Sequence, residues 1–215
     1  MIKSANIATT YKRKESLAKT IETLKGQFDI IRVYGNDYLP NIEGVECYTG
    51  IDRTDNSKFT WANEHRDEYY FSCDDDILYP KDYVENTLYY LKKYDSLYIT
   101  YHGRKLKQKD VSYYTGHDIY SCLREVLGNW IIDVPGTGVS AFDLRHFKVD
   151  ISKWEFQRMS DLMMGLELAK VGKKILCVQH PIWWLKDQGQ KGIYHEVKDE
   201  TNHIKVANDI YQYTN

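Results

Sequence analysis

Several features that would assign the sequence to a special class of protein are missing or scarce. Its four cysteines are scattered over 215 residues without a CxxC pair, so we interpret them as reduced packing residues. There is no internal repeat, no low-complexity segment, no signal-peptide pattern and no apolar run long enough to span a bilayer. The formal net charge of −2 gives no global sign of a nucleic-acid or membrane surface. We therefore expect a soluble, cytoplasmic protein.

The first hundred residues alternate short apolar runs with helical patterns. With 42% hydrophobic and 28% charged residues, the composition is that of an ordinary globular protein with one sizeable core. The order β-α-β-β-α-β-α-β predicts an α/β fold with a mostly parallel central sheet flanked by helices. The expected strands are 5–10, 28–34, 45–49, 68–73 and 96–102, and the expected helices are 15–26, 58–66 and one that Pro80 opens.

The second half of the chain is less regular, and no linker marks a second domain. We expect a single domain with a nucleotide-sugar-binding half (about 1–103), an acceptor-binding half (about 104–198) and a helical tail (199–215). Within the second half, the patterns predict a basic loop at 104–110, a helix at 117–127, a glycine-rich turn into a strand at 136–143, a helix at 160–172 and a strand at 173–179.

Three polar clusters follow expected strands at the point where each strand ends. They are Thr9–Arg13, Gly35–Asp37 and the acidic triplet Asp74–Asp76. Ligands of α/β sheets bind beyond the carboxyl ends of the strands, so these clusters should meet at one edge. Adjacent carboxylates repel one another and suit a hard divalent cation such as Mg²⁺ or Mn²⁺. The alternative is a solvated acidic turn before a helix.

Three segments, in this order and spacing, resemble a GT-A-fold (Rossmann-like) glycosyltransferase of the family 2 type. They are IATTYKRKESLAKTIETL, FSCDDDILYPKDYV with its DxD motif, and SDLMMGLELAKVGKKI, and the resemblance spans about residues 3–180. It implies a hexosyltransferase-type enzyme that moves a sugar from a nucleoside diphosphate onto an acceptor hydroxyl, with Mn²⁺ or Mg²⁺ as cofactor.

The resemblance also implies a donor site. The first strand and its loop would hold the nucleotide, an acidic or amide residue after the second strand would read the base, and a lysine would face the base or phosphates. Here GND replaces the common pair of aspartates, which leaves the base open, with UDP favoured. The implied nucleotide-sugar-binding residues are Thr9, Tyr11, Arg13, Asn36, Asp37, Lys58, Asp74 and Asp75.

The catalytic and metal residues are implied in the same way. Asp74 and Asp76 would ligate the metal, and His180 would be a third ligand, with His195 as the alternative. Asp161, at the start of the late helix, matches the general base, and one displacement with one base gives inversion. Retention is not excluded by the spacing.

The acceptor and the oligomeric state are not readable from the sequence. Trp183 and Trp184 are candidates for a sugar-stacking platform, although core packing is an alternative role. The basic stretch Arg104, Lys105, Lys107 and Lys109 would suit a phosphate-rich acceptor such as nucleic acid or a lipid-linked phosphate, or it is a solvated loop.

Other function classes fit the sequence less well. A sugar nucleotidyltransferase needs a glycine-rich loop after the first strand, and ATTYKRKES has no glycine. A haloacid-dehalogenase-type phosphatase needs its DxDxT on the first strand, whereas the aspartates here follow about three strands. A non-catalytic module that binds a nucleotide sugar or glycan is the main alternative that is not an enzyme.

Overall fold

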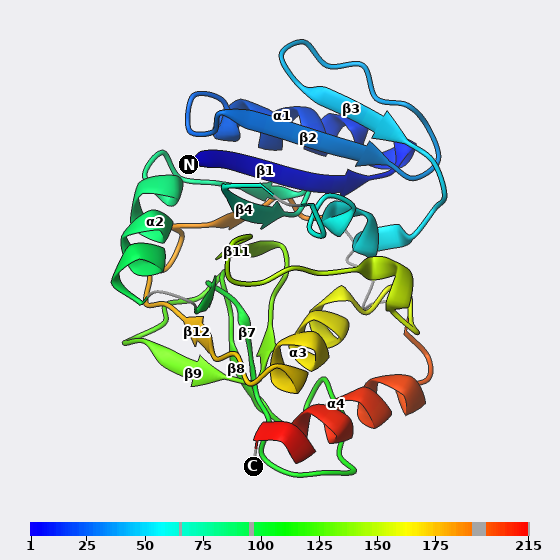
Figure 1. Ribbon diagram of the computed structural model, residues 1–215, viewed down its shortest axis with the longest axis vertical. Coiled ribbons are helices and arrows are strands. Elements are labelled where there is room, and N and C mark those ends of the chain that lie inside the picture. The colour runs from blue at the N-terminus through cyan, green and yellow to red at the C-terminus, as the bar shows by residue number, and fades with distance from the viewer. Residues whose placement is uncertain (65, 95–96, 191–196, 215) are drawn as a thin grey trace.

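A mixed, mostly parallel sheet organises the chain (Figure 1). The computed structural model describes residues 1–64, 66–94, 97–190 and 197–214. Eight strands lie in the order β3-β2-β1-β4-β11-β6-β12-β9. The β3-β2-β1-β4 run and the β6-β12 pair are parallel, whereas β11 runs antiparallel to β4 and β6, and β9 to β12. The strands are β1 (Ile2–Thr9), β2 (Ile30–Gly35), β3 (Glu46–Thr49), β4 (Glu68–Cys73), β6 (Tyr98–Thr100), β9 (Trp130–Ile132), β11 (Val139–Asp143) and β12 (Ile175–Cys177).

Smaller elements complete the fold. One three-stranded sheet has the order β10-β7-β8, and β5 pairs with β13. Their bounds are β5 (Ile77–Leu78), β7 (Gly103–Lys105), β8 (Asp118–Tyr120), β10 (Val134–Pro135) and β13 (Lys186–Asp187). The helices are η1 (Tyr11–Arg13), α1 (Lys14–Leu24), η2 (Thr54–Phe59), α2 (Tyr83–Lys93), η3 (Ile151–Lys153), α3 (Ser160–Lys170) and α4 (Thr201–Thr214). No helix in these described ranges is long and apolar enough to cross a membrane.

Helices cover both faces of the large sheet. Leu17 of α1 and Tyr83 of α2 belong to one apolar cluster, and Leu162 of α3 belongs to a second that α4 also joins. In β4, Phe71 packs in the first cluster and Tyr70 in the second, as the alternation of side chains along a strand requires. The late helices α3 and α4 lie side by side (Figure 1). This layered α/β architecture confirms the fold class predicted from the sequence.

Two of the expected helices are wrong. Residues 117–127 form β8 and turns, because the residues at helical spacing, Ile119, Leu123 and Leu127, are 48%, 37% and 75% exposed and give no buried stripe. Of the range expected as a helix at 58–66, residues 58–64 are the end of η2 followed by turns, in which Thr60 and Ala62 donate to carbonyls three residues back.

Two smaller expectations also need correction. The basic stretch is not wholly a loop, since residues 103–105 form β7 between β10 and β8. The helix after Pro80 begins only at Tyr83, whose amide donates to the Pro80 carbonyl, so this proline precedes the first helical turn.

A buried ion pair ties the three parallel strands that carry the candidate site. Arg32 of β2 donates to both carboxylate oxygens of Glu68 of β4 at 2.8 and 3.2 Å, and the two side chains are 1% and 0% exposed. Ser4 of β1, between them, donates its hydroxyl to Glu68, and Asn6 accepts from Arg32. Charges removed from water in this way need every partner in place.

We predict that Arg32→Met lowers the free energy of unfolding by roughly 3–5 kcal/mol, because it leaves the Glu68 carboxylate buried without its cation. Urea unfolding measures the loss. Lys25→Met, which breaks the exposed pair with Glu22, is the control and should change stability little. Equal losses in the two variants would show that the buried pair is not important.

Candidate active site

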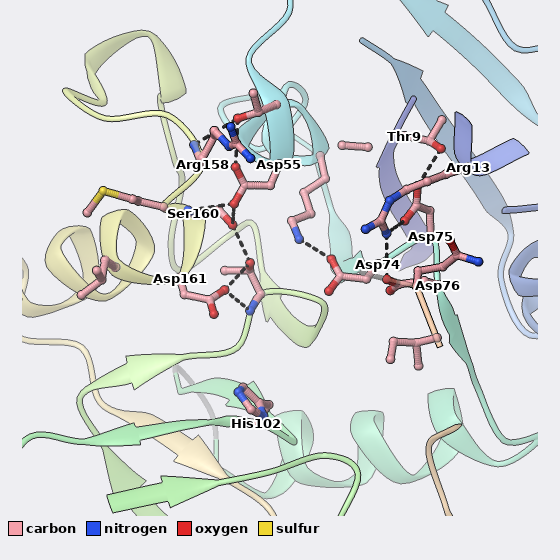
Figure 2. A pocket seen from close by; sticks show the side chains of 18 of the residues that line it. Thr9, Arg13, Asp55, Asp74, Asp75, Asp76, His102, Arg158, Ser160 and Asp161 are labelled. Atoms are coloured by element: carbon pink, nitrogen blue, oxygen red, sulfur yellow. Dashed lines mark hydrogen bonds and ion pairs between the residues drawn. The ribbon is translucent and has the colours of Figure 1, made fainter. Parts of the chain in front are cut away.

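A cavity of about 860 Å³ opens at the carboxyl ends of β1, β2 and β4. Figure 2 shows its two sides, with the acidic triplet and Arg13 on one side and Asp161 with Ser160 and Asp55 on the other. The structure therefore brings together most of the residues that the sequence suggested. Those that line the cavity are Thr9, Arg13, Asn36, Lys58, Asp74, Asp75, Asp76 and Asp161.

Two protein cations offset the repulsion within the acidic triplet. Nη1 of Arg13, from η1, lies 2.8 Å from Asp75 Oδ1 and 2.7 Å from Asp76 Oδ2. Nζ of Lys58, from η2, lies 2.6 Å from Asp74 Oδ1. Three carboxylates against these two cations still leave the cluster formally negative.

The pKa of Asp76 is raised by its burial and by this excess of negative charge. Burial, followed by the charges of Asp74 and Asp75, raises the pKa of Asp76 from 3.8 to about 6, although Arg13 opposes the shift. Burial also lowers the pKa of the Lys58 ammonium, but Asp74 and Asp55 outweigh burial, so the net shift is upward. Lys58 therefore stays charged beneath the cavity.

The backbone and the carboxylate of Asp74 both lie against Gly138. The amide of Asp74 donates to the Gly138 carbonyl at 3.0 Å. A Cβ on Gly138 would lie 1.9 Å from Asp74 Oδ2, so only glycine leaves room for this carboxylate. On the neighbouring strand, Thr9 donates its hydroxyl to Asp75 at 2.7 Å. Asp75 is thus held by Thr9 and Arg13, whereas the Asp74 side chain remains 44% exposed.

On the opposite side, Thr137 orients Asp161. Oδ1 of Asp161 accepts from the Thr137 amide at 2.8 Å and from its hydroxyl at 2.6 Å. Asp55 accepts from the amide and hydroxyl of Ser160, at the start of α3, so it satisfies a backbone donor at the helix terminus. The second oxygen of Asp161 is left to face the cavity.

The other residues expected to contact the nucleotide base lie at the margin of the cavity. Asn36 lines the cavity, but its side chain is engaged, donating to the Thr54 carbonyl at 2.9 Å and accepting from Ser57 at 2.6 Å. Asp37 accepts a hydrogen bond from the amide of Tyr11 at 2.7 Å. Neither Asp37 nor Tyr11 lines the cavity. Tyr11 is 55% exposed, so its ring lies at the protein surface at the start of η1.

His180 does not lie with the aspartates, which corrects its expected role as third metal ligand. It is 5% exposed and lines a different cavity of about 440 Å³. Its Nε2 is 3.2 Å from the Tyr101 carbonyl, and its ring stacks on Trp184. The alternative ligand, His195, lies outside the described residues. Within those residues, no group of three or more metal-ligating side chains is present.

Most of the residues expected to bind the acceptor also lie away from the main cavity. Trp184 packs on Tyr101 and donates to Asp82 at the second cavity, and Trp183 is 69% exposed away from the main one. Two of the four cations of the basic stretch, Lys105 and Lys107, form ion pairs within the protein, and Arg104 alone among the four lines the main cavity.

His102 is a cavity residue that the sequence analysis missed. Burial lowers its pKa to about 4 despite the opposing charge of Asp161, so the imidazole is neutral. Its Nδ1 accepts from the Cys122 amide at 3.3 Å, which leaves the hydrogen on Nε2. Its position directly after β6, beyond the carboxyl end of a strand, was the available signal.

The donor set of the triplet fits a divalent cation held partly by a ligand. Asp74 and Asp76 each have one carboxylate oxygen that accepts no hydrogen bond from the described residues. Two carboxylates suit Mg²⁺ or Mn²⁺, which take their other ligands from phosphate oxygens and water. The raised pKa of Asp76 agrees with a cluster that can accept further positive charge.

The structural comparison identifies the fold of the chain, whereas the sequence comparisons find no match. No family model matches the chain, and no curated protein matches it. Its structure is similar to the crystal structure of S. aureus TarS 1-349, a GT-A glycosyltransferase, with a TM-score of 0.57 and 8% identity. The match covers 99% of this chain and 71% of that one. The chain therefore has the GT-A fold.

The raised pKa of Asp76 predicts a pH-dependent stability. Because the folded protein binds this proton more tightly than the unfolded chain does, the stabilisation is fully present below about pH 4 and is lost as pH rises through about 6. Asp76→Asn removes the titration. Relative to the unmodified protein, the variant should gain on the order of 1–3 kcal/mol between pH 4 and pH 7.

Urea unfolding at several pH values measures this difference. Asp29→Asn is the control of opposite sign, because its backbone hydrogen bond with Lys3 lowers the pKa of Asp29. If the Asp76 and Asp29 variants drift in the same direction with pH, the assignment of excess negative charge to the triplet is wrong.

Proposed function

We propose that the protein is a metal-dependent glycosyltransferase that moves a sugar from a nucleoside diphosphate, with UDP favoured, to an acceptor hydroxyl with inversion. One observation carries the proposal: Asp161 and the triplet Asp74–Asp76 line opposite sides of one cavity at the ligand-binding edge of a GT-A fold. The four free cysteines agree with a cytoplasmic location, which is part of the proposal.

The donor would lie along the carboxyl ends of β1, β2 and β4. Thr9, Arg13 and Asn36 line this part of the cavity and would hold ribose and base, while Lys58 supplies a buried positive charge near the diphosphate. The exposed ring of Tyr11, in the same short helix η1 as Arg13, would pack on the nucleotide base.

Mn²⁺ or Mg²⁺ would be held by Asp74 and Asp76 together with the donor's own phosphate oxygens. When bound, the cation stabilises the negative charge that develops on the departing diphosphate. Lys58 and Arg13 would contribute to the same stabilisation as fixed charges. Gly138 keeps the Asp74 carboxylate in position for this role.

Asp161 would act as the general base. Thr137 fixes one of its oxygens with two hydrogen bonds, and the other can take the proton of the acceptor hydroxyl as that oxygen attacks the anomeric carbon. Attack from the Asp161 side, opposite the diphosphate on the triplet side, inverts the configuration at that carbon.

The donor assignment predicts metal-dependent nucleotide binding. Calorimetric titration with UDP, GDP and other nucleoside diphosphates should give binding that requires Mn²⁺, and Asp76→Asn should abolish the metal dependence because one of two protein ligands is lost. Asp67→Asn, at the exposed opposite end of the β4 region, is the control and should bind normally.

Absence of nucleotide binding with and without Mn²⁺ would reject the glycosyltransferase and favour the glycan-binding module. Binding that is unchanged in Asp76→Asn would reject only the metal assignment.

The base assignment predicts a split between binding and turnover. Asp161→Asn should bind the donor with unchanged affinity but lose about 10²- to 10⁴-fold in kcat, because an amide cannot take the hydroxyl proton. Release of the nucleoside diphosphate, with water or a panel of glycans as acceptor, measures the loss. Asp67→Asn again serves as control, and near-normal turnover of Asp161→Asn would remove Asp161 as the base.

A further inference from the structure

Arg104 differs from the other cations of its stretch. Lys105 lies 2.8 Å from Asp133, and Lys107 lies 2.6 Å from Asp118, so both are neutralised within the protein. Among the described residues, no carboxylate lies within ion-pair distance of Arg104. Its strand, β7, instead directs it to the main cavity, which it lines. A guanidinium without an acidic partner is therefore presented to whatever occupies that cavity.

Aromatic residues hold the guanidinium in place. Its carbon lies 4.3 Å from the centre of the Tyr113 ring and 5.8 Å from that of Tyr114, and Nη1 donates to the Tyr113 hydroxyl at 3.1 Å. The buried Nε of Arg104 has no hydrogen-bond partner among the described residues. Stacking fixes the plane of the Arg104 guanidinium. Its buried Nε–H donor remains without an acceptor in the described part of the chain, which costs free energy.

A second unused polar atom comes from the C-terminal helix. His203 of α4 is 8% exposed and lines the same cavity. Its Nε2 is 3.1 Å from the Tyr114 hydroxyl, whereas its Nδ1 has no partner among the described residues. Burial lowers the pKa of His203, so it is neutral. If the Tyr114 hydroxyl donates to Nε2, the hydrogen sits on Nδ1 as a further donor.

The helix α4 also fixes the segment that carries these aromatic residues. Glu200, directly before α4, accepts from the Ser112 hydroxyl and from the Tyr113 amide at 2.8 Å. Asn208 donates to Asp110 at 2.8 Å. The cluster is thus preorganised by contacts of Glu200 and α4 with the segment 110–113, which reduces the entropy that ligand binding would otherwise cost.

The cluster lies on the side of the cavity that carries the candidate base. The helix α3, which carries Asp161, packs against α4, which carries His203, and against β10, which pairs with β7 so that Val134 lies opposite Arg104. The triplet that would bind the donor diphosphate has its own cations, Arg13 and Lys58. An anion at Arg104 is therefore most simply a part of the second substrate.

We propose that Arg104, Tyr114 and His203 form an acceptor subsite that binds a singly charged anionic group, a carboxylate or a phosphodiester, of the acceptor. This inference rests on the proposed function, because it takes the cavity to hold donor and acceptor together. One guanidinium with neutral donors around it matches one negative charge. The acceptor class is then an acidic glycan or a phosphodiester-linked chain, and a neutral sugar is excluded.

Ligand-observed NMR with the protein saturated by UDP and Mg²⁺, which is diamagnetic, tests the subsite. The probes are methyl β-glucuronide, its neutral match methyl β-glucoside, and dimethyl phosphate. At least one anionic probe should bind more tightly than the neutral one, and which anion binds identifies the source. Arg104→Gln should weaken that binding roughly 10- to 100-fold, because charge-assisted hydrogen bonds are lost. Lys109→Gln, the same charge change at an exposed residue, should have no effect.

The outcomes separate the two proposals. If UDP binds and the anionic probes bind no better than the glucoside, the acceptor subsite is wrong and the glycosyltransferase stands. If Arg104→Gln weakens UDP as much as the anionic probe, Arg104 belongs to the donor site and the inference is overturned. If UDP itself does not bind, the proposed function falls and the acceptor assignment falls with it.

Discussion

The repulsion among three adjacent carboxylates is the constraint on which the rest of the site depends. Asp74–Asp76 follow a buried strand, where water offsets little of that repulsion. Arg13 from η1 and Lys58 from η2 offset part of the repulsion through ion pairs. The two short helical segments that follow β1 and β3 must therefore fold back over the end of β4. The compensation is incomplete, and burial together with the charges of Asp74 and Asp75 raises the pKa of Asp76. A site built this way keeps capacity for one more cation.

The short segment Gly136-Thr137-Gly138 connects both sides of the cavity. Gly138 accepts from the Asp74 amide and leaves space for its carboxylate, while Thr137 holds Asp161 with two hydrogen bonds. A Cβ on Gly136 would lie 2.5 Å from the ring of His102. The segment leads directly into β11, which is antiparallel between β4 and β6. The one antiparallel insertion of this region thus fixes the spacing between the groups that would act on donor and acceptor.

How much of this was predictable depends on the range of the interaction involved. The edge formed by Thr9, Arg13 and the triplet was predictable, because strand ends are local in sequence and parallel strands share an edge. His180 was misplaced because its position follows from an aromatic cluster with Tyr101 and Trp184 that no spacing reveals. The helix expected at 117–127 failed because burial, not periodicity, decides whether apolar residues form a stripe. His203 was missed because only the packing of α4 brings it to the cavity.

The two ends of the cavity differ in their charge. A divalent cation at the triplet would cancel the charge of a donor diphosphate, so the complex of the two would place little net charge at that end. Arg104, at the Asp161 side, has no acidic partner among the described residues, and its charge would then be the unbalanced one. Asp161 cannot neutralise it by contact, since Thr137 holds that carboxylate elsewhere. An anionic acceptor would resolve the imbalance and would bring its hydroxyl to the side of Asp161, the proposed base. The electrostatic asymmetry that the triplet creates would then also select the second substrate.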